Sequence, residues 1–384
     1  MKFKPTSLPV SPGSTDERDE VPGDGIGTTC ISDAELRRLD RTAALKLDVD
    51  IKLRWFKIRQ VMHRELRRVT NDLMELLSPS NDVSVLLLVG MTGIGKTTLA
   101  DNLSRVMGEM HYAECDPSEV PIIYIKAPAN GETSHSWRST YSRILEAAHE
   151  PLIGAKVLTV TVDNIMSQPR GKDGRTVDEL RRAVEKMLHY RKVRFIIIDE
   201  AQHYVRTRRS GGANSHEGSS ADTPTLDTLK SIASVAQTKL LLLAPHEFVE
   251  RAIEYAQLAR RAEIVHYRRY GQAIPADKTE FQRALAVMLG QWPFEEVPNL
   301  GLYADEVMKS TLGSIGLLKD ALLKLAILQS KSADHSFQTA MLAKAFKSPR
   351  ALEVIDDEAV RGEEALRGAT YGESAFAALM PAEV

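Results

Sequence analysis

The chain has 384 residues, enough to bury a substantial core as one large domain or two moderate ones. Hydrophobic residues make up 43% and charged residues 27%, a globular composition that argues against an extensively disordered chain. The formal net charge of −2 excludes a generally basic protein, so any binding to nucleic acid must come from local basic patches.

The cysteines and the hydropathy of the chain indicate which kinds of protein it can be. Cys30 and Cys115 are the only cysteines, and they have no metal-ligand spacing, so neither a zinc site nor a disulfide framework is predicted. The chain contains no run of about 18 apolar residues, and its first residues lack the apolar core of a signal peptide. We therefore expect a soluble protein without membrane contact, with the reducing cytoplasm as its compartment.

The N-terminal region divides into two parts. Residues 1–30 are rich in Pro, Gly, Ser and acidic residues, which predicts disorder. Residues 31–80 predict a basic helical extension, beginning at Ser32 and Glu35, which have the spacing of a capping box. An amphipathic pattern over residues 51–77 then predicts one long helix with a strongly basic first half.

Strands and helices alternate from residue 81 onward. Strands are expected at residues 83–89, 120–125, 194–198 and 239–243, with helices at 97–108, 137–148 and 178–189. The first strand is apolar throughout, as in a parallel strand buried on both faces. This alternation predicts an α/β core over residues 81–272, with a parallel sheet flanked by helices.

Three further segments complete the expected organisation. Residues 206–225 are rich in Gly, Ser and Asn and predict a flexible insertion within the core. Residues 273–348 are helical in pattern and predict a small lid. Residues 349–384 alternate acidic residues with Ala and Gly, and we expect a loose C-terminal tail.

A glycine-rich loop directly follows the first predicted strand. Its pattern is G-x-x-x-x-G-K-[ST], and Thr98 continues into a helix, which is the context of a phosphate-binding loop. Glycines let backbone N–H groups curl around phosphate oxygens, and the helix N-terminus adds partial positive charge. A glycine-rich turn that precedes Lys-Thr by chance is the alternative. The residues of the expected ATP cradle are Gly90, Met91, Thr92, Gly93, Ile94, Gly95, Lys96, Thr97 and Thr98.

Two carboxylates follow the third predicted strand. We expect Lys96 to contact the β- and γ-phosphates, while the Thr97 hydroxyl and Asp199 hold Mg²⁺. Glu200, the next residue, is placed to orient and deprotonate the attacking water. A solvated turn is the other interpretation of Asp199-Glu200. Together the loop and the carboxylates predict an ATPase that uses ATP and Mg²⁺.

These segments resemble a specific family. Residues 199–204 (Asp-Glu-Ala-Gln-His-Tyr) and 258–267 (Leu-Ala-Arg-Arg-Ala-Glu-Ile-Val-His-Tyr) are its more discriminating parts, and residues 226–230 and 313–319 continue the likeness. The chain resembles the TniB/TnsC-like AAA+ ATPases that regulate DNA transposition, over roughly residues 83–328.

The resemblance implies a fold, a function and a set of partners. The fold is a P-loop NTPase of AAA+ type with a helical lid. The function is an ATP-dependent regulator that assembles on double-stranded DNA as a ring or helical filament and links a target-selector protein to a transposase, with ATP hydrolysis driving disassembly. Arg261, or its neighbour Arg260, would act on the nucleotide of the adjacent subunit; a solvated helix end is the alternative for both.

The chain departs from this family at two positions. Where relatives usually carry Gly-Thr after the fourth strand, this chain has Ala-Pro-His, which makes His246 a candidate γ-phosphate sensor or a plain loop histidine. The lid position that carries an arginine in many AAA+ proteins corresponds to Gly316, with Lys319 one turn later.

Two regions are candidates for DNA contact. Similar transposition ATPases face DNA with the loop after the second strand, which here carries Lys126 and Thr133. A solvent-facing loop lysine is the alternative for Lys126. The basic stretch over residues 52–68 could bind phosphates or could pack its apolar face while its charges stay in water. No base-reading motif occurs, so binding independent of base sequence is expected.

Two rival functions remain open at this stage. The first is a signalling ATPase whose ATP-gated oligomers scaffold other proteins without DNA. The second is a nucleotide-binding module that never hydrolyses ATP.

Overall fold

The computed structural model describes residues 31–78, 80–112, 116–128, 136–151, 161–162, 165–166, 176–204, 223–248, 262–332 and 334–370. Residues 1–30, for which disorder is predicted, lie outside these residues, and so do both cysteines. Most of the expected insertion over residues 206–225 also lies outside them. The last three residues of that insertion, 223–225, belong to a helix.

A five-stranded parallel sheet forms the centre of the molecule. Its strands are β1 (Val85–Val89), β2 (Ile122–Lys126), β5 (Phe195–Asp199), β6 (Lys239–Ala244) and β7 (Ala262–His266). They lie in the order β2-β5-β6-β1-β7, and every pair is parallel. β1 and β5 are buried along their whole length, as their apolar sequences predict.

The fifth strand, β7, is not among the strands expected from the sequence. It lies at the edge of the sheet and pairs with β1, from Val85 opposite Ala262 to Val89 opposite His266. Because an edge strand needs fewer buried side chains, its Ala-Glu-Ile-Val-His sequence gives a weaker signal than the central strands do.

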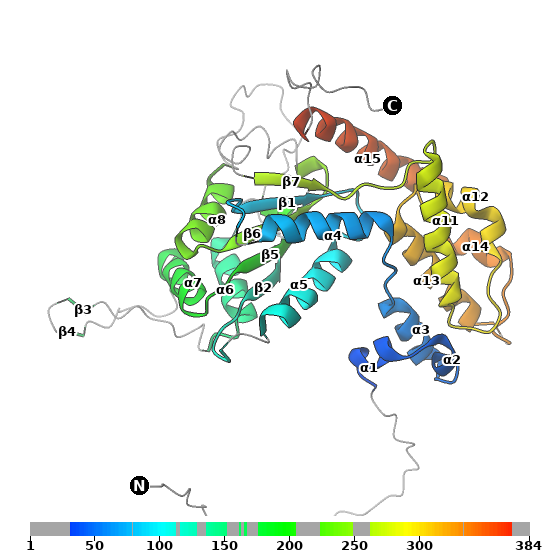
Figure 1. Ribbon diagram of the computed structural model, residues 1–384, viewed down its shortest axis with the longest axis horizontal. Helices are drawn as coiled ribbons and strands as arrows, with labels where there is room; N and C mark the ends of the chain where they lie inside the picture. Colours follow the sequence, from blue (N-terminus) through cyan, green and yellow to red (C-terminus); the bar gives the residue numbers. More distant parts are fainter. Residues whose placement is uncertain are drawn as a thin grey trace, which may run out of the picture.

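Helices cover both faces of the sheet (Figure 1). α4 (Arg64–Leu77) and α5 (Lys96–Tyr112) share one apolar core with the sheet. α6 (Trp137–Ala147), α7 (Val177–Tyr190) and α8 (Thr223–Ala236) form the core on the other face. The four residues expected on the inner side of α7 are buried: Leu180, Val184, Met187 and Leu188. A two-stranded antiparallel ribbon, β3 (Thr161–Val162) and β4 (Ile165–Met166), stands apart from this sheet.

The predicted helix over residues 51–77 is in fact two helices. α3 (Val49–Ile58) ends before an extended residue, Arg59, and α4 starts after His63, whose ring caps its first turn. The buried His63 ring also hydrogen-bonds to the hydroxyls of Tyr267 and Tyr270, at 3.1 and 3.0 Å. Tertiary contacts thus favour a break where the periodic pattern alone does not show one.

The two helices on either side of the break pack on different parts of the protein, α3 on the helical lid and α4 on the sheet. α1 (Asp33–Arg38), which has the predicted Ser32–Glu35 capping box, α2 (Arg41–Ala44) and α3 pack on the lid rather than on the sheet. The lid comprises α11 (Pro275–Gly290), η3 (Leu300–Tyr303), α12 (Ala304–Ser310), α13 (Ile315–Ser330) and α14 (Ala340–Ala345). Trp55, Phe56 and Trp292 are fully buried at this junction, each contributing roughly 1.5–3 kcal/mol or more by burial. No helix among the described residues is both long and apolar enough to cross a membrane.

The expected loose tail begins instead with a docked helix, α15 (Pro349–Thr370). Ala359 and Leu366 are 0% and 2% exposed, and they belong to the cores on opposite faces of the sheet. Charged residues are frequent along α15, and Val354 and Val360 are exposed, so its sequence looks solvated although one side of it is covered.

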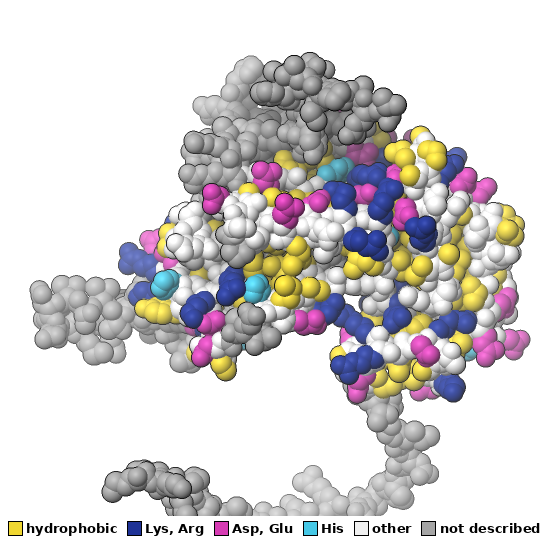
Figure 2. Space-filling view, in the orientation of Figure 1, with side chains coloured by type: hydrophobic (Ala, Val, Ile, Leu, Met, Phe, Trp, Pro, Cys, Tyr) yellow, Lys and Arg dark blue, Asp and Glu magenta, His cyan; other side chains and the backbone are white. Residues whose placement is uncertain are grey.

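Two buried carboxylates join α4 to the lid. Glu65 and Asp277 are 2% and 1% exposed, and arginines from two segments surround them. Arg268 pairs with Glu65 at 2.9 Å and with Asp277 at 2.7 Å, and Arg64 and Arg68 contribute further ion pairs. Figure 2 shows Lys and Arg side chains gathered over α4 and its junction with the lid. Much of the basic stretch over residues 52–68 is therefore engaged in packing and ion pairs.

We expect Asp277→Ala to lower the free energy of unfolding by about 3–5 kcal/mol, because it leaves partly buried arginines without their partner. Burial alone raises the pKa of Asp277, but hydrogen bonds from Arg268, the Gly271 N–H and Arg64 outweigh burial and lower the pKa to about 2. The folded pKa lies below the unfolded value, so this stabilisation is present above about pH 4 and is lost as the pH falls toward about 2.

Urea unfolding of wild type and variant across this pH range measures the effect. Asp320→Ala on α13, at an exposed position, is the control, with an expected change within about 0.5 kcal/mol. An equal cost for both variants at neutral pH would contradict a structural role for the Asp277 cluster.

Candidate nucleotide site

The carboxyl ends of β1, β6, β5 and β2 meet at one edge of the sheet, and the candidate residues follow them. Parallel strands place their ends together, which is where open α/β sheets bind ligands. The phosphate loop follows β1, His246 follows β6, Asp199 ends β5 and Lys126 ends β2. The order β5-β6-β1 places one strand between the loop and the carboxylates.

The glycine-rich loop has the backbone that a phosphate cradle requires. Gly93 and Gly95 have φ angles of +80° and +109°, in the region that favours glycine. α5 begins at Lys96, so its unpaired N–H groups face the loop. A side chain on Gly90 would place its Cβ 2.7 Å from the carbonyl oxygen of Tyr267, which explains a glycine there.

Lys96 lies inside this loop. Its ammonium donates hydrogen bonds to the carbonyl oxygens of Gly90 and Met91, at 2.7 and 3.1 Å. Burial lowers the pKa of Lys96 to about 8, although the nearby Glu200, Asp199 and Glu358 raise it. A partly buried cation that contacts the loop backbone fits a bound polyphosphate, whose negative charge would favour the protonated lysine.

The Asp199 carboxylate accepts three hydrogen bonds beside the phosphate loop. Its Oδ2 accepts from Thr97 Oγ1 at 2.8 Å and from the Tyr124 hydroxyl at 3.1 Å, and its Oδ1 accepts from the Glu200 N–H at 2.9 Å. The residues expected to hold magnesium thus touch each other across the site. This oxygen-only donor set suits a Mg²⁺ that keeps its remaining ligands from water and phosphate.

Tyr124 is a residue of the site that sequence reasoning missed. It comes from β2, and it fixes the orientation of the Asp199 carboxylate. Its only signal is a lone hydroxyl within the otherwise apolar run Ile-Ile-Tyr-Ile. Burial raises the pKa of Tyr124, and the nearby Asp199 and Asp101 carboxylates raise it further, so the hydroxyl remains a donor.

Glu200 is exposed at the end of β5, beside the buried Asp199. Its φ angle is +58°, a left-handed conformation that is uncommon outside glycine and often occurs at functional sites. The Gln202 side-chain amide donates a hydrogen bond to its carboxylate. The position fits a base that can contact water.

The lid lies directly on the phosphate loop. Ser314 donates a hydrogen bond to the Gly93 carbonyl oxygen at 3.1 Å, and a Cβ on Gly316 would lie 2.0 Å from that oxygen. Lys319 instead donates to the carbonyl oxygen of Phe56 at 2.6 Å and lies over its ring. Lys319 therefore binds the N-terminal helices, and Gly316 provides the close contact between lid and loop.

His246 is 1% exposed and lies against His266 at the end of β7, with their Nε2 atoms 3.2 Å apart. Burial lowers the pKa of His246 to about 3, and its neighbours His266, Lys96 and Arg269 lower it as well. A neutral histidine can donate one hydrogen bond to a phosphate, but here its ring is covered.

The remaining candidates are less closely associated with the loop. Lys126 is exposed and lies opposite Asp199 in the β2–β5 register. Arg143 of α6, also exposed, donates to the Lys126 carbonyl oxygen at 3.0 Å and adds a second cation that the sequence does not single out. Thr133, Arg260 and Arg261 lie outside the described residues.

Comparison with known proteins supports the fold. Residues 81–252 match the profile of the family described as AAA domain. No curated protein matches the chain. The Aeropyrum pernix ORC1 protein, solved in complex with DNA, is 17% identical over 78% of this chain and 69% of its own, with a TM-score of 0.51.

Two further solved structures are similar at lower scores. The Aeropyrum pernix ORC2 protein, in ADPNP–ADP complexes, is 18% identical over 76% of this chain and 69% of its own, with a TM-score of 0.48. Domain III of the Thermotoga maritima replication initiation protein DnaA is 14% identical over 76% of this chain and 97% of its own, with a TM-score of 0.42. The link to transposition ATPases remains a prediction from sequence segments. The chain has the AAA+ P-loop fold, and the AAA domain profile matches it over residues 81–252.

Proposed function

We propose that this protein binds ATP with Mg²⁺ and hydrolyses it, and that its ATP-bound form assembles on double-stranded DNA to link a target-selector protein to a transposase. The proposed binding and hydrolysis of ATP rest on the hydrogen bonds that Thr97 and Tyr124 donate to Asp199. This carboxylate lies beside the phosphate loop that contains Lys96. Proteins with an AAA domain generally hydrolyse nucleotides, which agrees with that assignment.

Four residues of the site have direct roles in hydrolysis. Lys96 releases its loop carbonyls and binds the β- and γ-phosphates. The Thr97 hydroxyl and Asp199 hold Mg²⁺, which would neutralise charge on the phosphates. Glu200 orients a water and accepts its proton.

The DNA part of the proposal rests on the sheet edge beside the site. Lys126 and Arg143 are exposed there, next to the loop that faces DNA in similar transposition ATPases. Assembly would line up one such pair per subunit along the duplex, and phosphate contacts that are weak singly would act together. One fold relative, the Aeropyrum pernix ORC1 protein, was solved in complex with DNA. The transposase and target selector follow from the resemblance of residues 199–204 and 258–267.

ATP-dependent DNA binding tests this function. We expect binding to require ATP or a non-hydrolysable analogue, to be equal on two unrelated duplexes, and to weaken steeply with salt through counterion release. Lys126→Glu should weaken binding on both duplexes and reduce the salt slope by about 1 for the phosphate that Lys126 no longer neutralises, with ATP affinity unchanged. Fluorescence anisotropy across a salt series, with ATP analogue or ADP, measures all of these effects.

Lys331→Glu is the matched control, because it makes the same charge change at an exposed lid position distant in sequence from Lys126. Similar decreases in both variants would point to overall charge rather than to Lys126. If ATP drives oligomers but no DNA binds at low salt, a protein scaffold without DNA replaces the DNA regulator.

A further inference from the structure

α15 runs from the lid across the edge of the sheet that carries the candidate nucleotide site (Figure 1). Its buried residues, Ala359 and Leu366, belong to the cores on the two faces of the sheet, so the helix spans this edge from one side to the other. Glu358 and Gly362, on the same part of the helix, contact the candidate nucleotide site.

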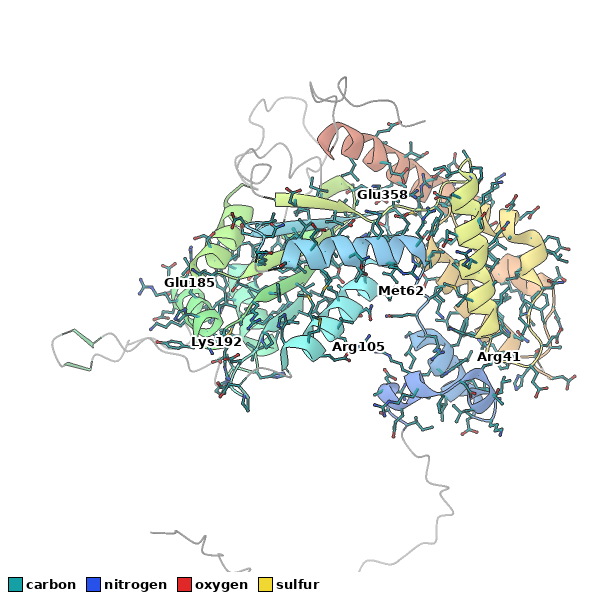
Figure 3. The ribbon with its side chains drawn as sticks, in the orientation of Figure 1. Arg41, Met62, Arg105, Glu185, Lys192 and Glu358 are labelled. Atoms are coloured by element: carbon teal, nitrogen blue, oxygen red, sulfur yellow. The ribbon has the colours of Figure 1, made fainter. Side chains whose placement is uncertain are left out.

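Two contacts join α15 to the site. The Thr92 hydroxyl, in the phosphate loop, donates a hydrogen bond to Glu358 Oε1 at 3.2 Å. Figure 3 labels Glu358 on the side of α15 that faces the strands. One turn later Gly362 packs on His246 so closely that a Cβ would lie 2.0 Å from the Cβ of the histidine. The helix thus covers the candidate γ-phosphate sensor.

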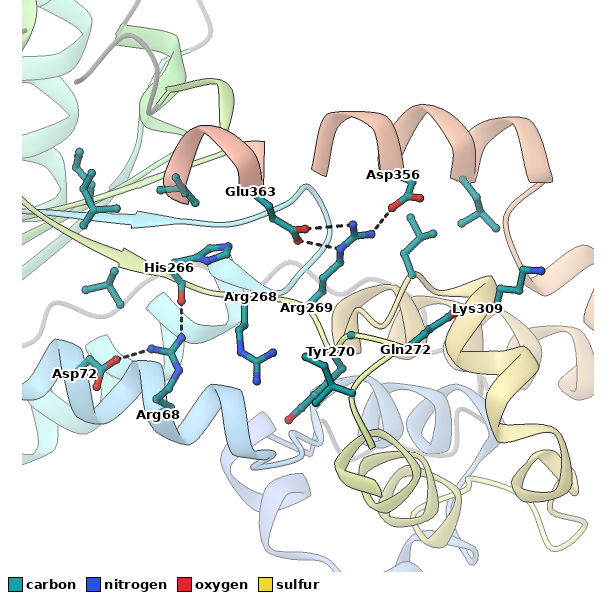
Figure 4. Close-up of a pocket in the computed structure, with 18 of the residues that line it drawn as sticks. Arg68, Asp72, His266, Arg268, Arg269, Tyr270, Gln272, Lys309, Asp356 and Glu363 are labelled. Atoms are coloured by element: carbon teal, nitrogen blue, oxygen red, sulfur yellow. Dashed lines mark hydrogen bonds and ion pairs between the residues drawn. The ribbon is translucent and has the colours of Figure 1, made fainter. Parts of the chain in front are cut away.

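An arginine from the linker after β7 anchors the helix. Arg269 is 15% exposed, and it pairs with Glu363 at 2.9 Å and with Asp356, two carboxylates about two turns apart on α15 (Figure 4). The anchor connects the position of α15 to the linker between sheet and lid, the segment that must bend if the lid moves relative to the sheet.

We propose that α15 is an autoinhibitory strap over the nucleotide site. The inference rests on the proposed binding of ATP. With the strap in place, the Glu358 carboxylate lies beside the phosphate loop, where it repels an incoming polyphosphate, and Gly362 keeps His246 from a γ-phosphate. ATP binding requires α15 to move away from the loop. The apparent affinity for ATP is therefore lower than the intrinsic affinity by the fraction of molecules with the strap open.

Two substitutions release the strap in different ways. Glu358→Gln replaces a charged acceptor by a neutral one, which weakens the hydrogen bond from Thr92 that holds the strap closed and also removes the repelling charge. Gly362→Ala pushes the helix off His246 by adding a Cβ. Each should lower the dissociation constant for ATP by about threefold or more, because the open fraction rises. Glu364→Gln removes the same charge from an exposed position of the same helix and should leave the affinity unchanged. Thermal melts monitored by circular dichroism show that the variants remain folded.

The full-length chain is titrated with a fluorescent ATP analogue, and hydrogen exchange of residues 349–370 is followed with and without a non-hydrolysable analogue. Tighter binding in both release variants, with faster exchange in wild-type α15 on nucleotide addition, supports the strap. Equal affinities in wild type and both variants, with unchanged exchange, overturn it while ATP binding stands. If neither wild type nor the variants bind nucleotide, the proposed function fails, and the strap fails with it.

Discussion

Glu200→Gln should leave ATP binding intact and slow hydrolysis by a factor of ~10²–10⁴, the usual effect of removing a general base. Glu200 follows the buried Asp199 at the end of β5, has a left-handed backbone conformation and is exposed to water. A carboxamide of the same size keeps the packing but cannot accept the proton of water. The residues that hold phosphate and magnesium are untouched, so affinity should not change.

Steady-state phosphate release and a separate binding titration distinguish the two effects. Glu146→Gln, which neutralises an exposed carboxylate on α6, is the control and should turn over like wild type. Turnover by Glu200→Gln near the wild-type rate would show that another group activates the water. Absence of turnover in wild-type protein that binds ATP, even with DNA present, would favour the non-hydrolysing module.

The central sheet and the phosphate loop could be predicted from the sequence because their signals are local. β1 is apolar throughout, and β5 and β6 are apolar apart from Asp199 and Lys239, which is the pattern of parallel strands buried on both faces. The glycines of the loop pattern are required by its backbone, because Gly93 and Gly95 take positive φ angles. Thr97 and Asp199 are 102 residues apart, and a parallel sheet brings them within hydrogen-bond distance.

The features that the sequence predicts wrongly depend on partners distant in the chain. The break at residues 59–63 is stabilised by Tyr267 and Tyr270, which the local periodicity of residues 51–77 does not include. α15 contributes few large apolar residues, and its docking depends on Arg269 and on the close contact of Gly362 with His246. The role of Tyr124 likewise depends on the neighbouring strand that carries Asp199.

Arg261 should act on the nucleotide of a neighbouring subunit rather than on its own. Arg261 lies outside the described residues, but the next residue, Ala262, begins β7 opposite the first residue of β1. The phosphate loop follows the other end of β1, so a strand of roughly 15 Å separates Ala262 from the cradle. Ala262 therefore lies at the end of the sheet opposite its own cradle, and we expect the adjacent Arg261 to act on the ATP of another subunit.

Mixing two inactive variants tests this geometry. Arg261→Ala should slow hydrolysis by a factor of ~10³–10⁵, the range for arginine fingers, and Lys96→Ala should abolish ATP binding because the cation at the phosphates is gone. In a mixed assembly, the Lys96→Ala subunits supply an intact Arg261 and the Arg261→Ala subunits supply an intact cradle. Mixing should therefore restore part of the activity.

Arg260→Ala, mixed in the same way, is the control and should be active without rescue. If mixed oligomers form and remain inactive, Arg261 does not act in trans; if Arg260→Ala is the variant that is inactive and rescued, Arg260 carries the role.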